Sequence, residues 1–484
     1  MASLSNPCDI ESKDFFPQLI VSVSIEGGFC QKQIVNPGDL YNYTEFTFYK
    51  SIPISVLPKL GSKAEISTSP SLPPGLYVDP NTGALSGTPT SPGDRQNYTV
   101  LRKGVALGQI SIQVRGLAAT KVYGQLGDLN CADPYVNGSC GSGGPVTADN
   151  LSGPNAVITD KSDGVYISSG NRVLYYPAGQ TTATRVYGQH GQFTCDAANA
   201  NSNLSCSTSI ISANTLSVPR GIFLDPLENL YITDSTPNNR LLVFPNGNTT
   251  PSRALGVPDY STAGPGPGSA SASNFVSPID LKLDSSGGIF LSDFGNNRIL
   301  YFPKDANVAT EVYGQPDFTN ASFSVSESRF STNQGFEIDS VGGMYIADRG
   351  NHRVVYFPKG STSATKVYGQ SSFSVNTGGL SNNGLTQPTD VALDQSENLF
   401  VADFFNHRIL VYPRTSLTSG MTAIAVIGQS GSFTCNASNN DGTGCTSAGT
   451  VPNTQSFRNP VAIHFDKQGR LYVVDNGNHR VVVY

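Results

Sequence analysis

Short apolar runs separated by clusters of Gly, Asn and Pro recur along the whole chain. In a representative stretch, the run 289–293 is followed by a polar turn and then by the run 298–302. Such runs, bounded by turn-forming residues, are typical of β-strands. Runs of Ala, Leu, Glu and Lys, which would favour helices, do not occur in the sequence. The pattern therefore predicts an all-β protein.

One hairpin pattern recurs six times in the last three-quarters of the chain. In each copy an apolar strand leads into a Gly- or Asn-rich turn, and a second strand begins at an Arg. Four copies are nearly identical, one has an extra residue in its turn, and one lacks the Asp that ends the first strand. The copies occupy residues 168–177, 234–245, 293–303, 348–358, 403–413 and 475–484.

Two further strands accompany each hairpin. The upstream strand ends in a second set of Asp residues, which we expect to accept hydrogen bonds from turn amides: Asp160, Asp225, Asp284, Asp339, Asp394 and Asp466. The downstream strand reads Ala-Thr-x-Val-Tyr-Gly-Gln or a variant of it. Four strands in every copy are typical of the blades of a β-propeller.

The repeat also indicates how the ring closes. The sixth copy ends at Tyr484, before its fourth strand, whereas an unaccompanied fourth strand stands at residues 119–125. Both irregularities disappear if 119–125 pairs beside 480–484, because one blade then contains strands from both ends of the propeller. We therefore predict a ring of six blades closed in this way.

The turns at 351–353, 406–408 and 478–480 read Asn-His-Arg and resemble those of the NHL-repeat family. The resemblance covers about residues 118–484 and implies a six-bladed β-propeller domain over residues 117–484. It implies little about activity, because such propellers serve as lyases, RNA binders, adhesion modules and receptor parts. The repeated Arg is expected to bind carbonyls or the repeated Asp, and Tyr123, Tyr187, Tyr313 and Tyr368 of the outer strands are expected to pack between blades.

The region before the propeller has a different pattern. Residues 72–89 contain the run Leu-Pro-Pro-Gly-Leu and the turn Asp-Pro-Asn-Thr-Gly, and they resemble the cadherin-like or immunoglobulin-like (Ig-like) domains of surface proteins. The resemblance implies an Ig-like β-sandwich over residues 31–116. Residues 1–30 form a separate segment, in which 19–25 is predicted as a strand that either joins this domain or pairs with another molecule.

The cysteines fall into four local couples, and three of these follow a Tyr-Gly-Gln or Ile-Gly-Gln sequence. An even number and repeated placement predict disulfides and an oxidising compartment. No couple has the Cys-x-x-Cys spacing of a zinc site. The couples are Cys8/Cys30, Cys131/Cys140, Cys195/Cys206 and Cys435/Cys445. Residues 1–6 lack the features of a signal peptide, so we expect either a signal upstream of them or a different biological start.

Eight sequons for N-linked glycosylation occur, and three of them lie in the loops that the cysteine couples span. They are Asn42, Asn97, Asn137, Asn150, Asn203, Asn248, Asn320 and Asn436. We expect N-linked glycans, above all at the three in cysteine loops: Asn137, Asn203 and Asn436.

Charge and hydropathy narrow the classes of partner. The net charge is −6 and no basic cluster occurs, which argues against nucleic acid as a partner because phosphates attract a cationic surface. No run approaches the roughly 18 apolar residues of a membrane-spanning helix. We therefore expect a secreted or cell-surface protein without a membrane span.

The histidines are the first candidates for catalytic chemistry. Peptidyl-glycine lyases are six-bladed NHL propellers that hold a metal with several histidines, but here three of the five histidines occupy the repeated turn. His190 lies in a loop, and only His464 lies on an innermost strand, which does not suffice for a metal site. No catalytic triad, nucleophile elbow or phosphate loop is present. The sequence therefore predicts no catalytic residue, no metal and no cofactor.

The innermost strands carry a few polar residues that alternation places on the channel side. They are Asp280, Lys282, Glu337, Asp390 and His464. One interpretation is a small polar site in the channel. The other is an ion pair between Lys282 and Glu337 of adjacent blades, together with solvated carboxylates.

These observations favour an extracellular structural or adhesive glycoprotein. Self-assembly would be head-to-tail, with the amino-terminal region of one copy on the propeller of the next, giving filaments or matrix; an extracellular matrix or surface protein is the alternative partner. Two other functions stay open: a surface module that recognises a ligand, and a lyase-like enzyme that uses the propeller channel.

Overall fold

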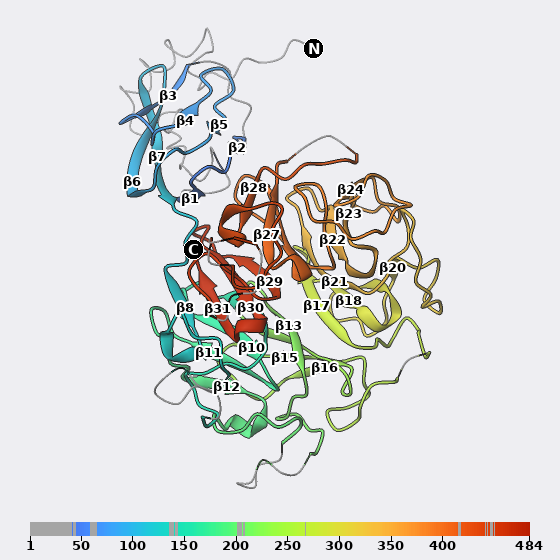
Figure 1. Ribbon diagram of the computed structural model, residues 1–484. Coiled ribbons are helices and arrows are strands. Elements are labelled where there is room, and N and C mark those ends of the chain that lie inside the picture. Colours follow the sequence, from blue (N-terminus) through green and yellow to red (C-terminus); the bar gives the residue numbers. More distant parts are fainter. Residues whose placement is uncertain are drawn as a thin grey trace, which may run out of the picture.

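The computed structural model shows an all-β protein of two domains, a small sandwich beside a larger ring of sheets (Figure 1). The described residues are 41, 45–58, 65–134, 140, 144–200, 206, 209–266, 268–414, 418–440, 442, 444–445, 449 and 451–484. The expected segment 1–30, with its strand and the Cys8–Cys30 couple, lies outside these residues. In this described part, none of the helical turns is long and apolar enough to cross a membrane.

The amino-terminal domain is a sandwich of a four-stranded and a three-stranded sheet, in the orders β1-β7-β6-β3 and β2-β5-β4. Alternating buried residues of both sheets form one core around Phe46, Leu85, Tyr98 and Ile112. The long β6–β7 hairpin ends the domain. The strands are β1 (Glu45–Tyr49), β2 (Ile54–Val56), β3 (Ile66–Ser69), β4 (Leu76–Val78), β5 (Leu85–Gly87), β6 (Gly93–Arg102) and β7 (Val105–Arg115).

The second domain contains six four-stranded antiparallel sheets, which are the six predicted blades. Blade 1 has β9 (Pro154–Thr159), β10 (Val165–Ser169), β11 (Arg172–Tyr176) and β12 (Arg185–Tyr187). Blade 2 has β13 (Pro219–Leu224), β14 (Leu230–Asp234), β15 (Arg240–Phe244) and β16 (Arg253–Leu255). Blade 3 has β17 (Pro278–Leu283), β18 (Ile289–Asp293), β19 (Arg298–Phe302) and β20 (Glu311–Tyr313).

Blade 4 has β21 (Asn333–Ile338), β22 (Met344–Asp348), β23 (Arg353–Phe357) and β24 (Lys366–Tyr368). Blade 5 has β25 (Pro388–Leu393), β26 (Leu399–Asp403), β27 (Arg408–Tyr412) and β28 (Ala425–Ile427). Blade 6 has β29 (Pro460–Phe465), β30 (Leu471–Asp475), β31 (Arg480–Val483) and β8 (Lys121–Tyr123). Short 3₁₀ turns connect some strands: η1 (Gln125–Gly127), η2 (Gln189–Gly191), η3 (Phe294–Asn296), η4 (Arg349–Asn351), η5 (Phe404–Asn406), η6 (Gln429–Gly431) and η7 (Asn476–Asn478).

The ring closes as the sequence predicts. Strand β8 pairs antiparallel with β31, and Val122 lies opposite Val482. The innermost strands of neighbouring blades touch in an unbroken circuit that runs from β9 through β13, β17, β21, β25 and β29 and back to β9. The C-terminus accordingly lies beside β8 (Figure 1). Closure within one blade leaves no free sheet edge between the first blade and the last.

The repeated Asp and Arg form a buried ion pair across the hairpin. In blade 4, Nε of Arg353 donates to Asp348 at 2.7 Å and both side chains are fully buried. The other carboxylate oxygen of Asp348 accepts from the backbone N–H of Ser331 at 2.7 Å, and the remaining guanidinium nitrogens donate to the carbonyls of Phe373, Ser326 and Arg329. Blades 2, 3, 5 and 6 have the same pair. The repeat is therefore held by fully satisfied buried charges, as expected for a structural motif.

A side chain in each hairpin turn binds the next blade. In blades 4, 5 and 6 it is histidine, whose Nδ1 accepts from a backbone N–H. In blades 1, 2 and 3 it is asparagine, whose Oδ1 accepts in the same way. The pairs are Asn171–Val218, Asn239–Ser277, Asn297–Thr332, His352–Gln387, His407–Asn459 and His479–Gly153. The turn histidines therefore join blades, in agreement with the structural role expected for them.

Aromatic rings fill the spaces between blades. Tyr123 of blade 6 packs edge-on against Tyr176 of blade 1, with ring centroids 5.2 Å apart. Tyr368 of blade 4 packs in the same way against Tyr412 of blade 5 at 5.3 Å. Tyr187 and Tyr313 likewise meet Phe244 and Phe357 of the following blades. The outer-strand tyrosines thus pack between blades, as predicted.

Three of the four expected disulfides are present: Cys131–Cys140, Cys195–Cys206 and Cys435–Cys445. Their sequence separations are 9, 11 and 10 residues, so each closes a short local loop. The covalent closure restricts each loop in the unfolded chain.

The sandwich docks on blades 5 and 6 through specific polar contacts. Tyr49 of β1 is buried; its hydroxyl accepts from the N–H of Leu471 at 2.7 Å and donates to the carbonyl of Gly469 at 3.0 Å. The side-chain amide of Gln395 donates to the carbonyl of Glu45 at 2.8 Å and accepts from the N–H of Thr47 at 3.0 Å. Gln395 therefore occupies hydrogen-bonding positions that a further strand would use beside β1.

The structure changes the interpretation of one sequon. Asn150 is fully buried; its Nδ2 donates to the carbonyl of Pro145 at 2.7 Å and its Oδ1 accepts from the N–H of Thr147 at 3.0 Å. A glycan on that nitrogen has no room in this fold, which argues against glycosylation at Asn150. Asn97, Asn248 and Asn436 are exposed and Asn320 is half-buried. Asn42, Asn137 and Asn203 lie outside the described residues.

Candidate channel site

A cavity of about 430 Å³ lies where the innermost strands of all six blades meet. Each blade contributes lining residues, among them Asn155, Arg220, Asp280, Glu337, Asp390 and His464. The cavity thus contains the five polar channel residues that the sequence predicted, since Lys282 also lines it. Its size falls within the range of about 300–1,000 Å³ that small-molecule pockets occupy.

An irregularity in the innermost strands decides which residues reach the channel. Each of these strands departs from regular pairing in its first half, for example between Pro219 and Ile222 of β13, and the other five strands do so at the same place. A bulge breaks the strict alternation of strand faces. In this irregular part of β13, Arg220 and Gly221 both line the cavity.

Three carboxylates surround one ammonium group in the deeper part of the cavity, which we call the channel floor (Asp280, Lys282, Glu337 and Asp390). Nζ of Lys282 lies 3.5 Å from Glu337 and 3.9 Å from Asp280. The ion pair between adjacent blades that the sequence suggested is therefore present. Burial acts to lower the pKa of Lys282, but the charges of Asp280, Glu337 and Asp390 outweigh it and raise that pKa above its usual value.

The aspartates of the floor also connect blades. One carboxylate oxygen of Asp280 accepts from the N–H of Phe336 in blade 4 at 3.1 Å. Asp390 accepts in the same way from Ile463 in blade 6 at 2.8 Å. A Cβ at residue 335 would lie 2.0 Å from Oδ1 of Asp390, so glycine at this position leaves room for the carboxylate. Burial, reinforced by the charge of Asp280, raises the pKa of Asp390 well above its usual value.

His464 is neutral in this setting. Its Nε2 lies 3.0 Å from Oγ1 of Thr159 and accepts from the N–H of the same residue at 3.3 Å. Burial, with a smaller contribution from the charge of Lys282, lowers the pKa of His464 to about 3. Both of these groups belong to Thr159 of blade 1, so His464 joins blade 6 to blade 1.

Two arginines that the sequence analysis did not single out line the same cavity. Arg220 is the second residue of β13, and its Nη1 donates to Oδ1 of Asn155 at 3.2 Å. Arg349 follows β22 in η4; its Nε donates to Gln387 at 3.1 Å and its guanidinium lies 5.2 Å from the centroid of the Phe404 ring. We call these two side chains the arginine pair.

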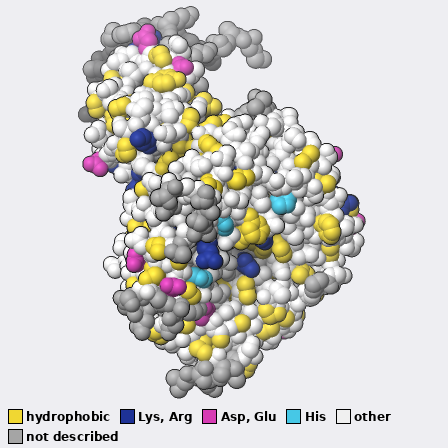
Figure 2. Space-filling view, viewed as in Figure 1, with side chains coloured by type: hydrophobic (Ala, Val, Ile, Leu, Met, Phe, Trp, Pro, Cys, Tyr) yellow, Lys and Arg dark blue, Asp and Glu magenta, His cyan; other side chains and the backbone are white. Residues whose placement is uncertain are grey.

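The arginine pair lies among groups that leave its charge uncompensated. Among the residues that the structure describes, no carboxylate lies within 4.0 Å of either guanidinium. Desolvation by the surrounding channel walls lowers the pKa of both, and the charge of Arg220 lowers that of Arg349 further. Figure 2 shows basic side chains and histidines gathered near the middle of the propeller face.

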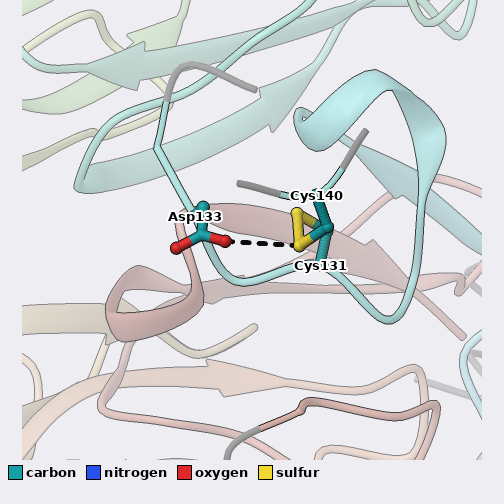
Figure 3. A group of neighbouring side chains, drawn as sticks. All are labelled: Cys131, Asp133 and Cys140. Carbon is teal, nitrogen blue, oxygen red and sulfur yellow. Dashed lines mark hydrogen bonds between the residues drawn. A yellow bond between two sulfur atoms is a disulfide. The ribbon is translucent and has the colours of Figure 1, made fainter. Parts of the chain in front are cut away.

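One further cluster has metal-ligand residue types: Cys131, Asp133 and Cys140 (Figure 3). The two sulfur atoms are joined in a disulfide, and Sγ of Cys140 lies 3.4 Å from a carboxylate oxygen of Asp133. Metal ions in proteins bind the thiolate form of cysteine. The oxidised cluster therefore does not offer the ligands of a zinc site.

Family models match both domains in part. The model described as "NHL repeat" matches residues 385–412 and 457–484, which belong to blades 5 and 6. The model described as "Putative Ig domain" matches residues 33–107. The chain thus contains NHL repeats and an Ig-like domain. No curated protein matches the sequence.

Several solved structures are similar over much of the chain. An auxiliary nutrient binding protein from Bacteroides ovatus is 13% identical, with 90% of this chain and 95% of that chain covered and a TM-score of 0.44. A protein of unknown function from Bacteroides thetaiotaomicron is 12% identical, with the same coverage and a TM-score of 0.48. A catalytically inactive virginiamycin B lyase from Staphylococcus aureus with quinupristin is 14% identical, covering 68% and 94%, at a TM-score of 0.38. Likeness at this level says nothing about ligand or activity.

Proposed function

We propose that this protein is an extracellular recognition module whose propeller channel binds a small polar ligand without transforming it. One observation supports the proposal above others: a cavity of about 430 Å³ lies on the axis of the ring and receives charged or polar side chains from all six blades. Pockets with a few convergent polar groups are the usual sites of small-molecule binding.

The arrangement favours binding over catalysis. A hydrolase or lyase needs a group that transfers a proton near neutral pH. Burial keeps the pKa of His464 at about 3, and Asp390, whose pKa is raised, is engaged by the N–H of Ile463. Lys282 stays protonated among its carboxylates. Asp280 and Asp390 each bind a backbone N–H of a neighbouring blade, a role that holds the wall in place. We therefore propose that the protein is not an enzyme and uses no metal or cofactor.

The disulfides support an extracellular or cell-surface location. All six cysteines in the described part of the chain are paired, and such bonds persist in oxidising compartments. The exposed sequons at Asn97, Asn248 and Asn436 would be accessible to glycosylation there.

Self-assembly into filaments or matrix stays a prediction from the sequence. A free strand edge on the sandwich would be the simplest place for a second copy to dock. Gln395 of the same chain already binds the edge of β1 at Glu45 and Thr47. Head-to-tail contact through β1 would have to displace this amide, so the contacts favour recognition of a ligand over assembly.

Saturation-transfer NMR on the intact protein tests the proposal with mixtures of amino acids, monosaccharides, dicarboxylates and amines. The matched variants are Ala462→Phe, which places a ring in the cavity, and Thr362→Phe, which places one on an exposed turn. We expect one compound class to bind the wild type and Thr362→Phe but not Ala462→Phe, with both variants folded by circular dichroism. Absence of binding to the wild type, or binding that persists in Ala462→Phe, would overturn the proposal.

A further inference from the structure

Two groups of opposite charge lie at different depths of the channel. The arginine pair (Arg220 and Arg349) comes from the start of an innermost strand and from a hairpin turn, which places it at the mouth. Asp280 and Asp390 lie one residue further along their own innermost strands than the position of Arg220. Lys282 and Glu337 lie three residues further, and a strand advances about 3.3 Å per residue. The channel therefore has a positive mouth and a separate floor.

The charge of each group is only partly matched within the protein. The floor has three carboxylates around one ammonium, so it is negative whenever more than one carboxylate is ionised. At the mouth, both guanidinium groups stay protonated, and they contact the uncharged side chains of Asn155, Gln387 and Phe404. The two guanidinium groups therefore bring like charges together at the mouth. Among the described residues, no carboxylate lies within salt-bridge distance of either group.

This polarity restricts the ligands that fit. A simple anion would be attracted by the arginine pair and repelled by the carboxylates of the floor. A simple cation would be attracted by the floor and repelled by the arginine pair. A molecule with an anionic group at one end and a cationic group at the other satisfies both regions at once. Arginine also has a planar fork of donors that suits two-point binding of a carboxylate.

We propose that the channel binds a small zwitterion of the amino-acid type, whose carboxylate lies between Arg220 and Arg349 and whose ammonium group points to the floor. This inference rests on the proposed function, because it names the class of ligand for the same cavity. Asn155 and Gln387 each hold one of the two guanidinium groups in place through a hydrogen bond.

Isothermal titration with probes of equal chain length tests the inference. The probes are 6-aminohexanoate, hexanoate and hexylamine, with β-alanine and 4-aminobutyrate as shorter zwitterions. We expect at least one of the zwitterions to bind about tenfold or more tightly than hexanoate and hexylamine. The preference should weaken as salt is raised, because exposed charges at the mouth are screened.

Variants of the mouth supply the structural control. Arg220→Ala and Arg349→Ala should each weaken zwitterion binding about 10- to 100-fold. Arg349→Lys should lose part of the affinity, because lysine lacks the planar fork of donors that binds a carboxylate at two points. Arg458→Ala is the matched control: Arg458 is exposed and lies near His407 and His479 of the repeated turns, but it does not line the cavity. Arg458→Ala should change the affinity for the zwitterion by no more than about twofold.

The outcomes separate the two proposals. The inference is overturned if hexanoate or hexylamine binds as tightly as the best zwitterion, or if the Arg220 and Arg349 variants behave like Arg458→Ala. It is also overturned if no zwitterion binds while another compound of the NMR mixtures occupies the channel, and the proposed function then stands. If no compound binds the wild type in either experiment, the proposed function itself fails.

Discussion

Nδ1 of His479 accepts a hydrogen bond of 2.9 Å from the backbone N–H of Gly153. This contact joins blade 6 to blade 1 and so completes a circuit of six similar contacts around the ring. An imidazole nitrogen can accept only while it is unprotonated. Half of the circuit therefore depends on neutral histidine, whereas the other half uses asparagine, which does not titrate.

The first prediction concerns pH. Burial lowers the pKa of His407 to about 4 and also lowers the pKa of His352 and of His479. Because the unfolded chain binds protons below about pH 6.5 and the folded chain only at lower pH, these contacts stabilise the fold fully above about pH 6.5 and less as pH falls toward 4. For His407 the loss between pH 7 and pH 5 is about 1–2 kcal/mol.

The measurement is the difference in unfolding free energy between the wild type and the triple variant His352→Asn/His407→Asn/His479→Asn. Asparagine keeps the acceptor, as in blades 1 to 3, so the triple variant should gain on the wild type as pH falls. Asp394, whose pKa burial raises to about 6, has an opposite effect on the pH dependence of stability. Because both proteins contain Asp394, its contribution cancels in the difference between their unfolding free energies. His190→Asn is the control, and equal pH profiles for the wild type and the triple variant would contradict the prediction.

Ring closure gives the second prediction. Val122 of β8 is 3% exposed and packs in the core that blades 5 and 6 share. Val122→Asp places an unpaired carboxylate there and should lower the free energy of unfolding by about 3 kcal/mol or more. Leu126→Asp, at a side chain that is 48% exposed, should cost little. Denaturant unfolding checks both, and similar midpoints would argue that β8 does not close the ring.

The buried ion pair of the repeat gives the third. Asp348→Ala leaves the fully buried guanidinium of Arg353 without its charged partner, which should cost about 3–5 kcal/mol. The double variant Asp348→Leu/Arg353→Met removes both charges and should recover part of this loss. Asp259→Ala, at an exposed loop, serves as the control in the same thermal unfolding series. If Asp348→Ala were as stable as Asp259→Ala, the ion pair between Asp348 and Arg353 would not be what stabilises the hairpin.

The interface between the domains gives the fourth. Tyr49→Phe removes the hydroxyl that binds Leu471 and Gly469 and leaves a buried N–H without a partner, at a cost of about 1–3 kcal/mol. Tyr77→Phe, at a side chain that is 58% exposed, is the control. Calorimetry should show one unfolding transition for the wild type and a sandwich transition at lower temperature for Tyr49→Phe. Unchanged calorimetric traces would speak against a fixed interface.

The same interface predicts how the isolated propeller behaves. Removal of residues 1–116 uncovers the surface of blades 5 and 6 on which Tyr49 and Ile52 pack. The truncated propeller should therefore fold but associate more readily than the full chain, in contrast to the monomer that its closed edges alone suggest. Sedimentation of both forms checks this.

Much of the fold could be predicted because each hairpin is a local unit that the sequence repeats. The Asp, the turn and the Arg recur together, so Asp348 and Arg353 indicate their own contact, and the displaced strand 119–125 indicates the closure. Contacts between blades were less predictable. Asn150 reads as an ordinary sequon, since only the tertiary fold shows that its amide is buried.

The channel was predicted in part for a related reason. Lys282 and Glu337 lie in the regular half of their strands, where alternation places side chains correctly. Arg220 lies at a bulge, where alternation fails, and Arg349 lies in a turn. A signal was present, since the position after the repeated Asp varies between copies as Phe294, Arg349, Phe404 and Asn476. A variable position within a repeat marks a residue that the shared fold does not require.

The most direct test of the central claim is a crystal structure of the protein soaked with the zwitterionic probe that binds most tightly in titration. The account predicts density for one molecule in the channel, with its carboxylate within hydrogen-bond distance of both Arg220 and Arg349 and its ammonium group directed toward Asp280, Glu337 and Asp390. A channel that stays empty at saturating probe, or a probe bound with its carboxylate away from the two arginines, would contradict it.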